Sequence, residues 1–365
     1  MSIAVALRHS RCAALIAALA VSVSTVAGLS GPVAAQPKSD NTTDKITAIT
    51  VSASRLDSYQ RGFGDTKRFG RLEFRGGMTM SSPDTRFGGF SGLIVAPDGR
   101  RFLAVSDEGN WLSGEFTYAG KAPSGITNAR MGPLLGLNGA PLKRKRDSDA
   151  EELALLSGTL SHGVALVAFE RNHRLVRYPI VNGALGRPTG LVGLPAESKR
   201  MTSNSGLEAV TVLRGGAFRG AILAFAEDLK DKDGHQIGWL LGKGAPKQLA
   251  VKEMGGFALT GAAALEDGSV LLLERRFRFT EGVKMRLRYV PADELKPGHV
   301  IEGETLISSD MTYEIDNMEA VAVHTGAGGE TVVTLISDDN FNKFVQRNLL
   351  LQFTLHPTAA KATQR

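Results

Sequence analysis

Acidic side chains recur at the ends of short apolar stretches in this sequence. Glu151, Glu208 and Glu319 each begin such a stretch. Further residues with oxygen ligands stand just before or just after stretches of the same kind, namely Asp107, Glu108, Asp149, Glu170, Glu227, Asp228, Glu274, Asp338, Asp339 and Asn340. Basic residues lie close to several of these acids, namely Arg171, Arg275, Arg276 and Lys343. A fold that gathers these side chains would create a dense group of carboxylates edged by cations.

Carboxylates at close range raise each other's pKa unless a cation offsets their charge. Calcium ions take about six to eight hard oxygen ligands. The sequence has only 7 His and 1 Cys, which offer little to zinc or copper. Divalent ions and guanidinium groups both neutralise phosphoryl oxygens, and Arg can do so through two parallel hydrogen bonds. These residues therefore favour calcium-assisted hydrolysis of a small phosphate ester.

The acids recur because the chain is built from repeats. Five segments share one pattern, in which a small or acidic residue begins an apolar strand and a turn leads to a second strand that ends in charge. They start at positions 91, 151, 208, 260 and 319, so the intervals are 60, 57, 52 and 59 residues. Two further strands are expected in each unit, for example over 236–241 and 247–251. Four antiparallel strands per unit predict an all-β fold, a β-propeller with radial blades.

The number of blades follows less directly from the sequence. Five units are visible, and residues 55–90 are long enough for most of another, so six blades are favoured over five. The last unit is one strand short, because only a polar tail follows residue 353. We therefore expect residues 46–54 to return and complete the last blade.

A propeller would bring the recurring acids together. The inner strands of a propeller point their ends toward a central channel, so equivalent positions of successive blades form a ring. We predict catalytic roles for Glu151, Glu208 and Glu319, and substrate binding by the four basic residues named above. Ca²⁺ is the predicted ion, and its predicted ligands are Asp107, Glu108, Asp149, Glu227, Asp228, Glu274, Asp338, Asp339 and Asn340.

The first 35 residues resemble a secretory signal peptide. Arg8 and Arg11 precede an apolar run, and Ala34 and Ala35 provide a small-residue cleavage pattern. An uncleaved N-terminal anchor is the alternative, because the run approaches membrane-spanning length. Residues 36–45 form a polar linker, 46–356 the propeller domain and 357–365 a polar tail. The expected product is a secreted or periplasmic monomer without an integral membrane segment.

Composition excludes several other classes of protein. The chain has 365 residues with 42 Gly, 14 Pro and 22% charged residues, which is typical of a folded protein and not of a fibrous or disulfide-framework one. The net charge of +6 would fall to +4 without residues 1–35, because they carry two Arg and no acid. No basic stripe rich in aromatic residues accompanies this charge, so nucleic acid is not an expected partner. The basic run 143–146 is interpreted as a solvated loop, with an anion-binding role as the alternative.

Several phrases of the sequence resemble those of one known family. They are residues 88–93 (GGFSGL), 105–109 (VSDEG), 149–154 (DAEELA), 204–209 (NSGLEA), 273–277 (LERRF), 317–320 (NMEA) and 336–341 (ISDDNF). Together they resemble the phytase-like family, described as having esterase-like activity of phytase. The resemblance implies a propeller similar to calcium-dependent phytases and a phosphoester hydrolase. Glu152 and Thr260 depart from the family pattern, where a small residue and an acid are expected, which argues against a full complement of metal ions.

A second interpretation gives these residues a structural role. The chain could be a non-catalytic propeller that binds a ligand or a partner, with acids and arginines forming ion pairs between blades. Each carboxylate would then be matched to an Arg or Lys. A group of carboxylates without such partners would instead favour the enzyme.

Overall fold

The computed structural model describes residues 45–64, 66–242 and 244–358, all of which belong to one compact unit, Asn41–Arg365. The predicted signal peptide and nearly all of the predicted linker lie outside the described residues. Strands dominate the described chain, and its one α-helix is α1 (Lys145–Ser148). No helix in these three ranges has the length and apolarity needed to cross a membrane.

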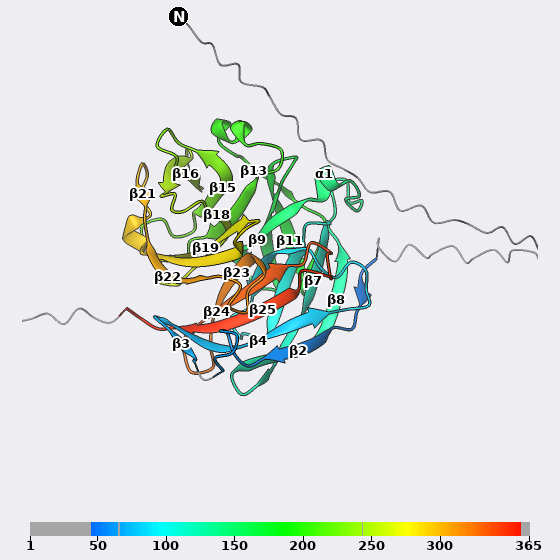
Figure 1. The fold of residues 1–365 in the computed structure, drawn as a ribbon. Coiled ribbons are helices and arrows are strands. Elements are labelled where there is room, and N and C mark those ends of the chain that lie inside the picture. Colours follow the sequence, from blue (N-terminus) through cyan, green and yellow to red (C-terminus); the bar gives the residue numbers. More distant parts are fainter. Residues whose placement is uncertain (1–44, 65, 243, 359–365) are drawn as a thin grey trace, which may run out of the picture. The chain divides into compact units, whose positions relative to one another are not determined.

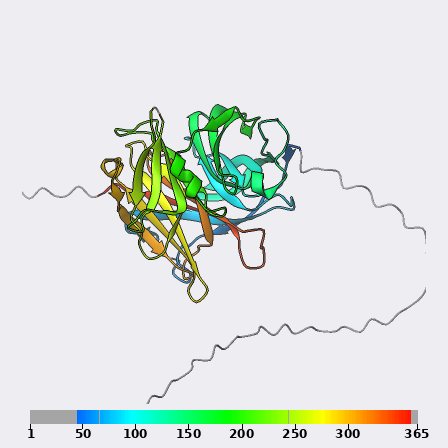
Figure 2. The same ribbon diagram turned by 90° about the horizontal axis from the view of Figure 1, so that it is seen from above.

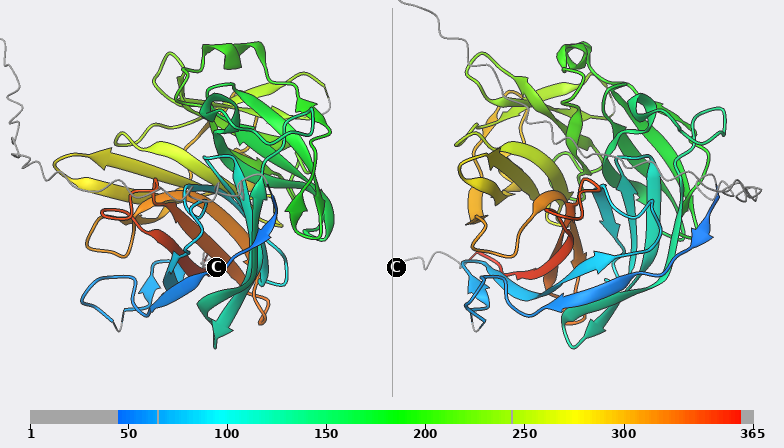
Figure 3. Two further views of the ribbon diagram at one scale, coloured as in Figure 1. Left: turned by 90° about the vertical axis from the view of Figure 1, so that its right-hand side faces the viewer. Right: turned by 45° about the vertical axis from the view of Figure 1, so that its right-hand side comes forward.

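The strands form five sheets, which Figures 1 and 3 show around a common axis. From the axis outward, the first contains β5 (Phe90–Val95), β6 (Arg101–Ser106), β7 (Asn110–Ala119), β8 (Ala122–Pro133) and β1 (Thr47–Ala48). The second contains β9 (Ala150–Gly158), β10 (His162–Phe169), β11 (Arg174–Val181) and β12 (Ala184–Leu185), with β13 (Gly190–Val192) also on β11. The third contains β14 (Leu207–Val212), β15 (Ile222–Lys230), β16 (Gln236–Leu241), β17 (Lys247–Val251) and β21 (Val300–Ile301).

The fourth and fifth sheets complete the ring. The fourth contains β18 (Ala258–Ala264), β19 (Val270–Arg278), β20 (Gly282–Val290) and β22 (Glu304–Ser309). The fifth contains β23 (Asn317–Thr325), β24 (Thr331–Asp338), β25 (Asn348–Leu355), β4 (Leu72–Ser81) and β2 (Ser52–Leu56), with β3 (Arg68–Phe69) also on β4. Each innermost strand contacts the next, and β23 contacts β5, so the ring is closed. The predicted all-β propeller is confirmed.

The propeller has five blades, so the preference for six was wrong. Residues 55–90 hold no extra blade, because β3 and β4 join the fifth sheet. The N-terminal segment does return to the last blade, as expected, but the fourth strand there is β4, paired with β25 from Leu355↔Leu72 to Asn348↔Met80. Residues 46–54 are divided instead, since β1 pairs with β8 in the first blade and β2 lies outside β4. Their side chains are half-buried or exposed, which suits outer strands and not a fourth strand within a blade.

Hydrophobic residues pack mainly between blades. Five clusters of buried side chains are found in the described chain, and each combines residues of two neighbouring blades. The cluster between the fourth and fifth blades, for example, joins Leu271 and Leu273 of β19 to Leu335 and Phe353 of β24 and β25. The cluster between the fifth and first blades includes Met78 and Met80 of β4. β4 thus contributes to the packing that closes the ring. Figure 2 shows the blades from above.

The innermost strands approach one another closely around the axis. A cavity of only about 40 Å³ remains among the five of them. Close packing here depends on small side chains: a Cβ atom added to Gly92 of β5 would lie 2.5 Å from the amide nitrogen of Leu153 in β9. Gly261 of β18 similarly lies against the carbonyl oxygen of Glu319, with 3.0 Å available. The channel is therefore narrow below its mouth.

We predict that Gly92→Ala destabilises the protein by about 1–3 kcal/mol, because the added methyl group forces β5 away from β9. Urea unfolding measures the free energy of unfolding. Gly193→Ala is the matched control, since no atom lies within 4 Å of its Cβ position and its φ is not in the left-handed region. Equal stability of the two variants would contradict the close approach of the inner strands.

Candidate functional site

Each innermost strand contains a β-bulge at the same point. The pairing of the first and second strands skips one residue in every blade, and the skipped residues are Ser91, Glu151, Glu208, Thr260 and Glu319. A bulge inserts one unpaired residue and changes the direction of its side chain, and such bulges are common next to active sites. These are the five positions at which the sequence repeats begin. The bulges thus create a first ring of side chains at one end of the channel.

The ends of the second strands supply a second ring. In the first three blades, a backbone hydrogen bond joins the end of the second strand to the residue two positions before the bulge. The amides of Asp107, Glu170 and Glu227 donate to the carbonyl oxygens of Gly89, Asp149 and Gly206, respectively. In the fourth and fifth blades, Arg275 pairs with Ala258 and Asp338 with Asn317, which are the equivalent positions. Four of the five second-ring residues are therefore acids, and the fourth blade contributes Arg275.

The acids of the two rings, together with Asp149, are here called the mouth cluster. They are Asp107, Asp149, Glu151, Glu170, Glu208, Glu227, Glu319 and Asp338. Oxygen atoms of Asp149, Glu151 and Glu170 lie within 4.8 Å of one another, and so do those of Glu170, Glu208 and Glu227. The structure therefore brings Glu208, from one repeat, next to Glu170, from the preceding one. These two triads have the composition of a hard-cation site, because each residue offers a carboxylate oxygen.

Burial and mutual repulsion raise the pKa values of the mouth cluster. Burial raises the pKa of Glu170 to about 7, with a further increase from Asp149. Burial raises the pKa of Glu319 to about 7 and outweighs the opposing effect of Arg275. Burial and the charges of Asp107 and Glu319 raise the pKa of Asp338 to about 8. The pKa values of Glu151 and Glu208 also lie well above the usual range, for the same two reasons.

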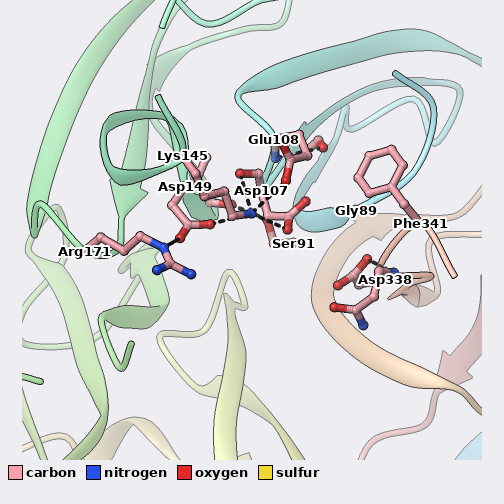
Figure 4. Close-up of polar contacts among 12 residues, drawn as sticks. Gly89, Ser91, Asp107, Glu108, Lys145, Asp149, Arg171, Asp338 and Phe341 are labelled. Atoms are coloured by element: carbon pink, nitrogen blue, oxygen red, sulfur yellow. Dashed lines mark hydrogen bonds and ion pairs between the residues drawn. The ribbon is translucent and has the colours of Figure 1, made fainter. Parts of the chain in front are cut away.

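Three cations of the chain neutralise part of the cluster. Arg275 Nε lies 3.0 Å from Glu319 Oε1. Asp149, which is 2% exposed, contacts both Arg171 and Lys145 (Figure 4). Lys145 Nζ also lies 2.6 Å from Asp107 Oδ2 and 3.2 Å from Glu108 Oε1.

The other acids of the cluster have no such partner. Glu151, Glu170, Glu208 and Glu227 form no ion pair with a Lys or Arg in the described part of the chain. The structural interpretation required every carboxylate to be matched to a cation, and these four are not. Asp338 of the fifth blade also forms no ion pair with a described residue, so the unpaired acids lie mainly, but not solely, at the second and third blades.

The two uncharged members of the first ring hold neighbouring blades together. Ser91 Oγ donates a hydrogen bond to the carbonyl oxygen of Ala150, just before the bulge of the second blade. Thr260 Oγ1 donates to the carbonyl oxygen of Met318 at 3.0 Å, just before the bulge of the fifth blade. The hydroxyl positions thus link blades by the same contact, and within the first ring only the Glu positions carry charge.

Glu152 follows the bulged Glu151 and lies deeper in the channel. Its carboxylate accepts hydrogen bonds from the backbone amides of Leu153 at 2.8 Å and Ala262 at 3.3 Å. Burial raises its pKa well above the usual range despite these bonds. Glu152 therefore occupies the space among the inner strands.

Several predicted site residues lie apart from the mouth cluster. Glu274 is 1% exposed and pairs with Arg286 at 2.5 Å and with Arg288, on the opposite face of β19 from Arg275. Successive residues of a strand face opposite sides, so Arg275 faces the mouth while the preceding residue, Glu274, is buried on the other side of β19. Arg276 pairs with Glu281 at 2.6 Å. Asp228 is 58% exposed and pairs with Lys230.

The β24–β25 loop contains three more predicted residues. Asp339 is 1% exposed, and its oxygens accept hydrogen bonds from the amides of Gly89 and Phe341 and from the side chain of Asn348. It therefore holds the loop against the first blade. Asn340 and Lys343 are exposed. Lys145, by contrast, was not among the predicted site residues, because its contacts with Asp107 span 38 residues and do not follow from the repeat.

Comparison with known proteins identifies the family of the chain. A model of the phytase-like family, described as "Esterase-like activity of phytase", matches residues 85–341, more than half of the chain. The chain belongs to the phytase-like family. The matched residues of this phytase-like chain include all five bulges. The resemblance noted in the sequence is thus confirmed, and the description of the family names an esterase-like activity.

Two solved structures illustrate distant similarity to the chain. Raptor of Chaetomium thermophilum is 11% identical, with a TM-score of 0.34, over 79% of this chain and 23% of that one. The phytase-like chain therefore spans less than a quarter of the length of Raptor. A hypothetical protein from Leishmania major is 9% identical, with a TM-score of 0.40, over 76% of this chain and 93% of that one. No curated protein matches the chain.

We predict that the cation-free protein loses stability as the pH rises from about 5 to about 8. The pKa values of Glu170, Glu319 and Asp338 are higher in the folded than in the unfolded state, so the stability that their protonation provides is present below about pH 4 and lost through about pH 8. Calcium should therefore raise the melting temperature more at pH 8 than at pH 5. An equal increase at both pH values would contradict this account of the cluster.

The buried Glu274 should behave as a structural acid. Glu274→Ala leaves Arg286 and Arg288 without their carboxylate, which we expect to cost about 3–5 kcal/mol of unfolding free energy. Asp228→Ala, on the exposed end of β15, is the control and should leave the unfolding curve in urea unchanged. Normal stability of the Glu274 variant would show that the two arginines do not depend on it.

Proposed function

We propose that this phytase-like protein is a calcium-dependent hydrolase of phosphate esters and that the channel mouth is its active site. The observation that carries the proposal is the presence of four carboxylates without an ion-pair partner among the described residues, Glu151, Glu170, Glu208 and Glu227, in two triads that share Glu170. Buried charges of one sign are costly, and a cation of the chain could have replaced any of them. Their presence is explained if they hold a divalent cation that acts on a substrate.

The residues present fit a hard cation in composition and in spacing. Glu170, Glu208 and Glu227 would hold it, with Glu151 beside them. When bound, the ion supplies charge neutralisation of the phosphoryl oxygens and lowers the pKa of a coordinated water. No His or Cys belongs to either triad, so oxygen-preferring Ca²⁺ suits the site better than zinc.

The remaining mouth residues have complementary roles in this proposal. Arg275 lies beside the acidic group and binds the phosphate through its guanidinium. Glu319, whose pKa is raised to about 7, accepts a proton from the attacking water, since a base is most effective when its pKa is near the working pH. The 3.0 Å contact between Arg275 and Glu319 places the anion-binding group next to this base. Arg171 provides a second guanidinium on the side of Asp149.

A depression beside the mouth offers space for the organic part of the ester. Its volume is about 710 Å³, and its lining includes Glu108 and Phe341. Because Glu108 also contacts Lys145, the depression adjoins the mouth cluster. An ester with its phosphate at the mouth would extend its alcohol group into this space. We also propose export from the cytoplasm, which rests only on the sequence of residues 1–35.

We predict that Glu208→Gln lowers kcat/KM by at least about 100-fold without loss of stability, because it removes a cation ligand and also an unpaired buried charge. Hydrolysis of p-nitrophenyl phosphate and bis-p-nitrophenyl phosphate measures activity on mono- and diesters. Asp228→Asn, one residue after Glu227 and outside the cluster, is the control and should retain full activity. Excess EGTA should abolish turnover and added Ca²⁺ should restore it; turnover that persists in EGTA would remove the metal from the mechanism.

A further inference from the structure

Lys145 has surroundings that differ from those of an ordinary surface lysine. Its Nζ atom lies 2.6 Å from Asp107 Oδ2, 2.9 Å from Asp149 Oδ1 and 3.2 Å from Glu108 Oε1. The backbone oxygen of Asp107 accepts a fourth contact at 3.0 Å. Figure 4 shows these oxygens converging on the ammonium group from several directions. Carboxylate and carbonyl oxygens are also the types of ligand that calcium prefers.

The chain holds this group in place by local structure. Lys145 begins α1 in the loop between the first and second blades, inside the basic run 143–146. Burial alone would lower its pKa, but hydrogen bonds to Asp107 and Asp149 and their charges outweigh burial and raise it. The ammonium therefore keeps its charge. Its neighbours in the run differ, since Arg144 pairs with Asp147 on the surface and Arg146 is exposed.

The oxygens around Lys145 could also bind a divalent cation, because one of them has no hydrogen-bond partner in the described chain. Asp107 Oδ1 is buried and accepts no hydrogen bond from any described residue. Gly89, with φ 65°, leaves room for this oxygen, because a Cβ atom there would lie 2.1 Å from it. Asp149 is nearly fully buried, so its direction is fixed. Three carboxylates and a carbonyl oxygen thus form a preorganised cradle filled by a side chain of the same chain.

We propose that Lys145 is a built-in cation that occupies one of two cation positions at the channel mouth. The divalent ion then binds only on the side of Glu170, Glu208 and Glu227, where no Lys or Arg of the described residues forms an ion pair. Loss of the ammonium group opens a second metal position with Asp107, Glu108 and Asp149 as ligands. The proposal rests on the proposed function in one respect, namely that the mouth binds a divalent cation.

Calcium titration of the full chain tests the proposal directly. The wild-type protein and Lys145→Met are freed of metal with EGTA, desalted and titrated with Ca²⁺ in a calorimeter. Methionine provides an apolar side chain similar to the stem of lysine but lacks the charged ammonium group and its hydrogen-bond donors. The variant is expected to bind one more Ca²⁺ per chain than the wild type. Arg146→Met, which removes a neighbouring exposed charge, is the control and should bind the wild-type number.

A second variant identifies the ligands of the additional ion. Lys145→Met combined with Asp107→Asn should return the stoichiometry to the wild-type value. Thermal unfolding provides a readout if Lys145→Met is poorly folded without metal: Ca²⁺ should then raise its melting temperature more than that of the wild type, because it replaces a lost internal cation.

The possible results separate this proposal from the proposed function. An extra ion in Lys145→Met supports the built-in cation, even if the wild type binds no calcium and the metal-dependent function fails. Equal, non-zero stoichiometries overturn the built-in cation and leave the metal-dependent function intact. If neither protein binds Ca²⁺, both are overturned.

Discussion

The arrangement of the mouth depends on one extra residue in the first strand of every blade. In a regular strand, side chains alternate between two faces, so two consecutive residues cannot both face the channel. The bulge at Glu151 removes that restriction, and Glu151 reaches the mouth cluster while Glu152 occupies the channel below it. Without the five bulges, the residues at the first ring would follow the alternation of the strands and the carboxylates would not meet.

The charge gathered in this way opposes folding, and the remainder of the propeller compensates for it. Raising the pKa of a carboxyl group by several units corresponds to several kcal/mol for its ionised form. The compensation comes from apolar packing between blades and from closure of the ring by β4. Active sites commonly retain such local strain when the surrounding structure fixes it. A closed ring of blades suits this purpose, since no single strand can relax alone.

The sequence repeats were sufficient to locate the blades but not to count them. The strands expected over 236–241 and 247–251 coincide with β16 and β17, because alternating patterns within a repeat are local information. The N-terminal strands belong to no repeat, so residues 55–90 were assigned to a sixth blade that does not exist. At the site, Glu274 and Arg275 are adjacent, and only the register of β19 decides which of them faces the mouth. Contacts such as Lys145 with Asp107 join different parts of the chain and have no local signal.

The mouth is chemically asymmetric although its backbone repeats five times. A ring of five glutamates would place too much charge at one point, and hydroxyl groups at Ser91 and Thr260 relieve it by binding backbone oxygens of the next blade. The unpaired acids then concentrate at the second and third blades, where Glu151 and Glu208 meet Glu170 and Glu227. The fourth blade instead contributes Arg275 to the second ring. A sector suited to a cation therefore adjoins a sector suited to an anion, and a phosphate ester bound to a divalent ion needs both. Different residues at a few equivalent positions of the five blades are thus enough to give the mouth a cation-binding side and an anion-binding side.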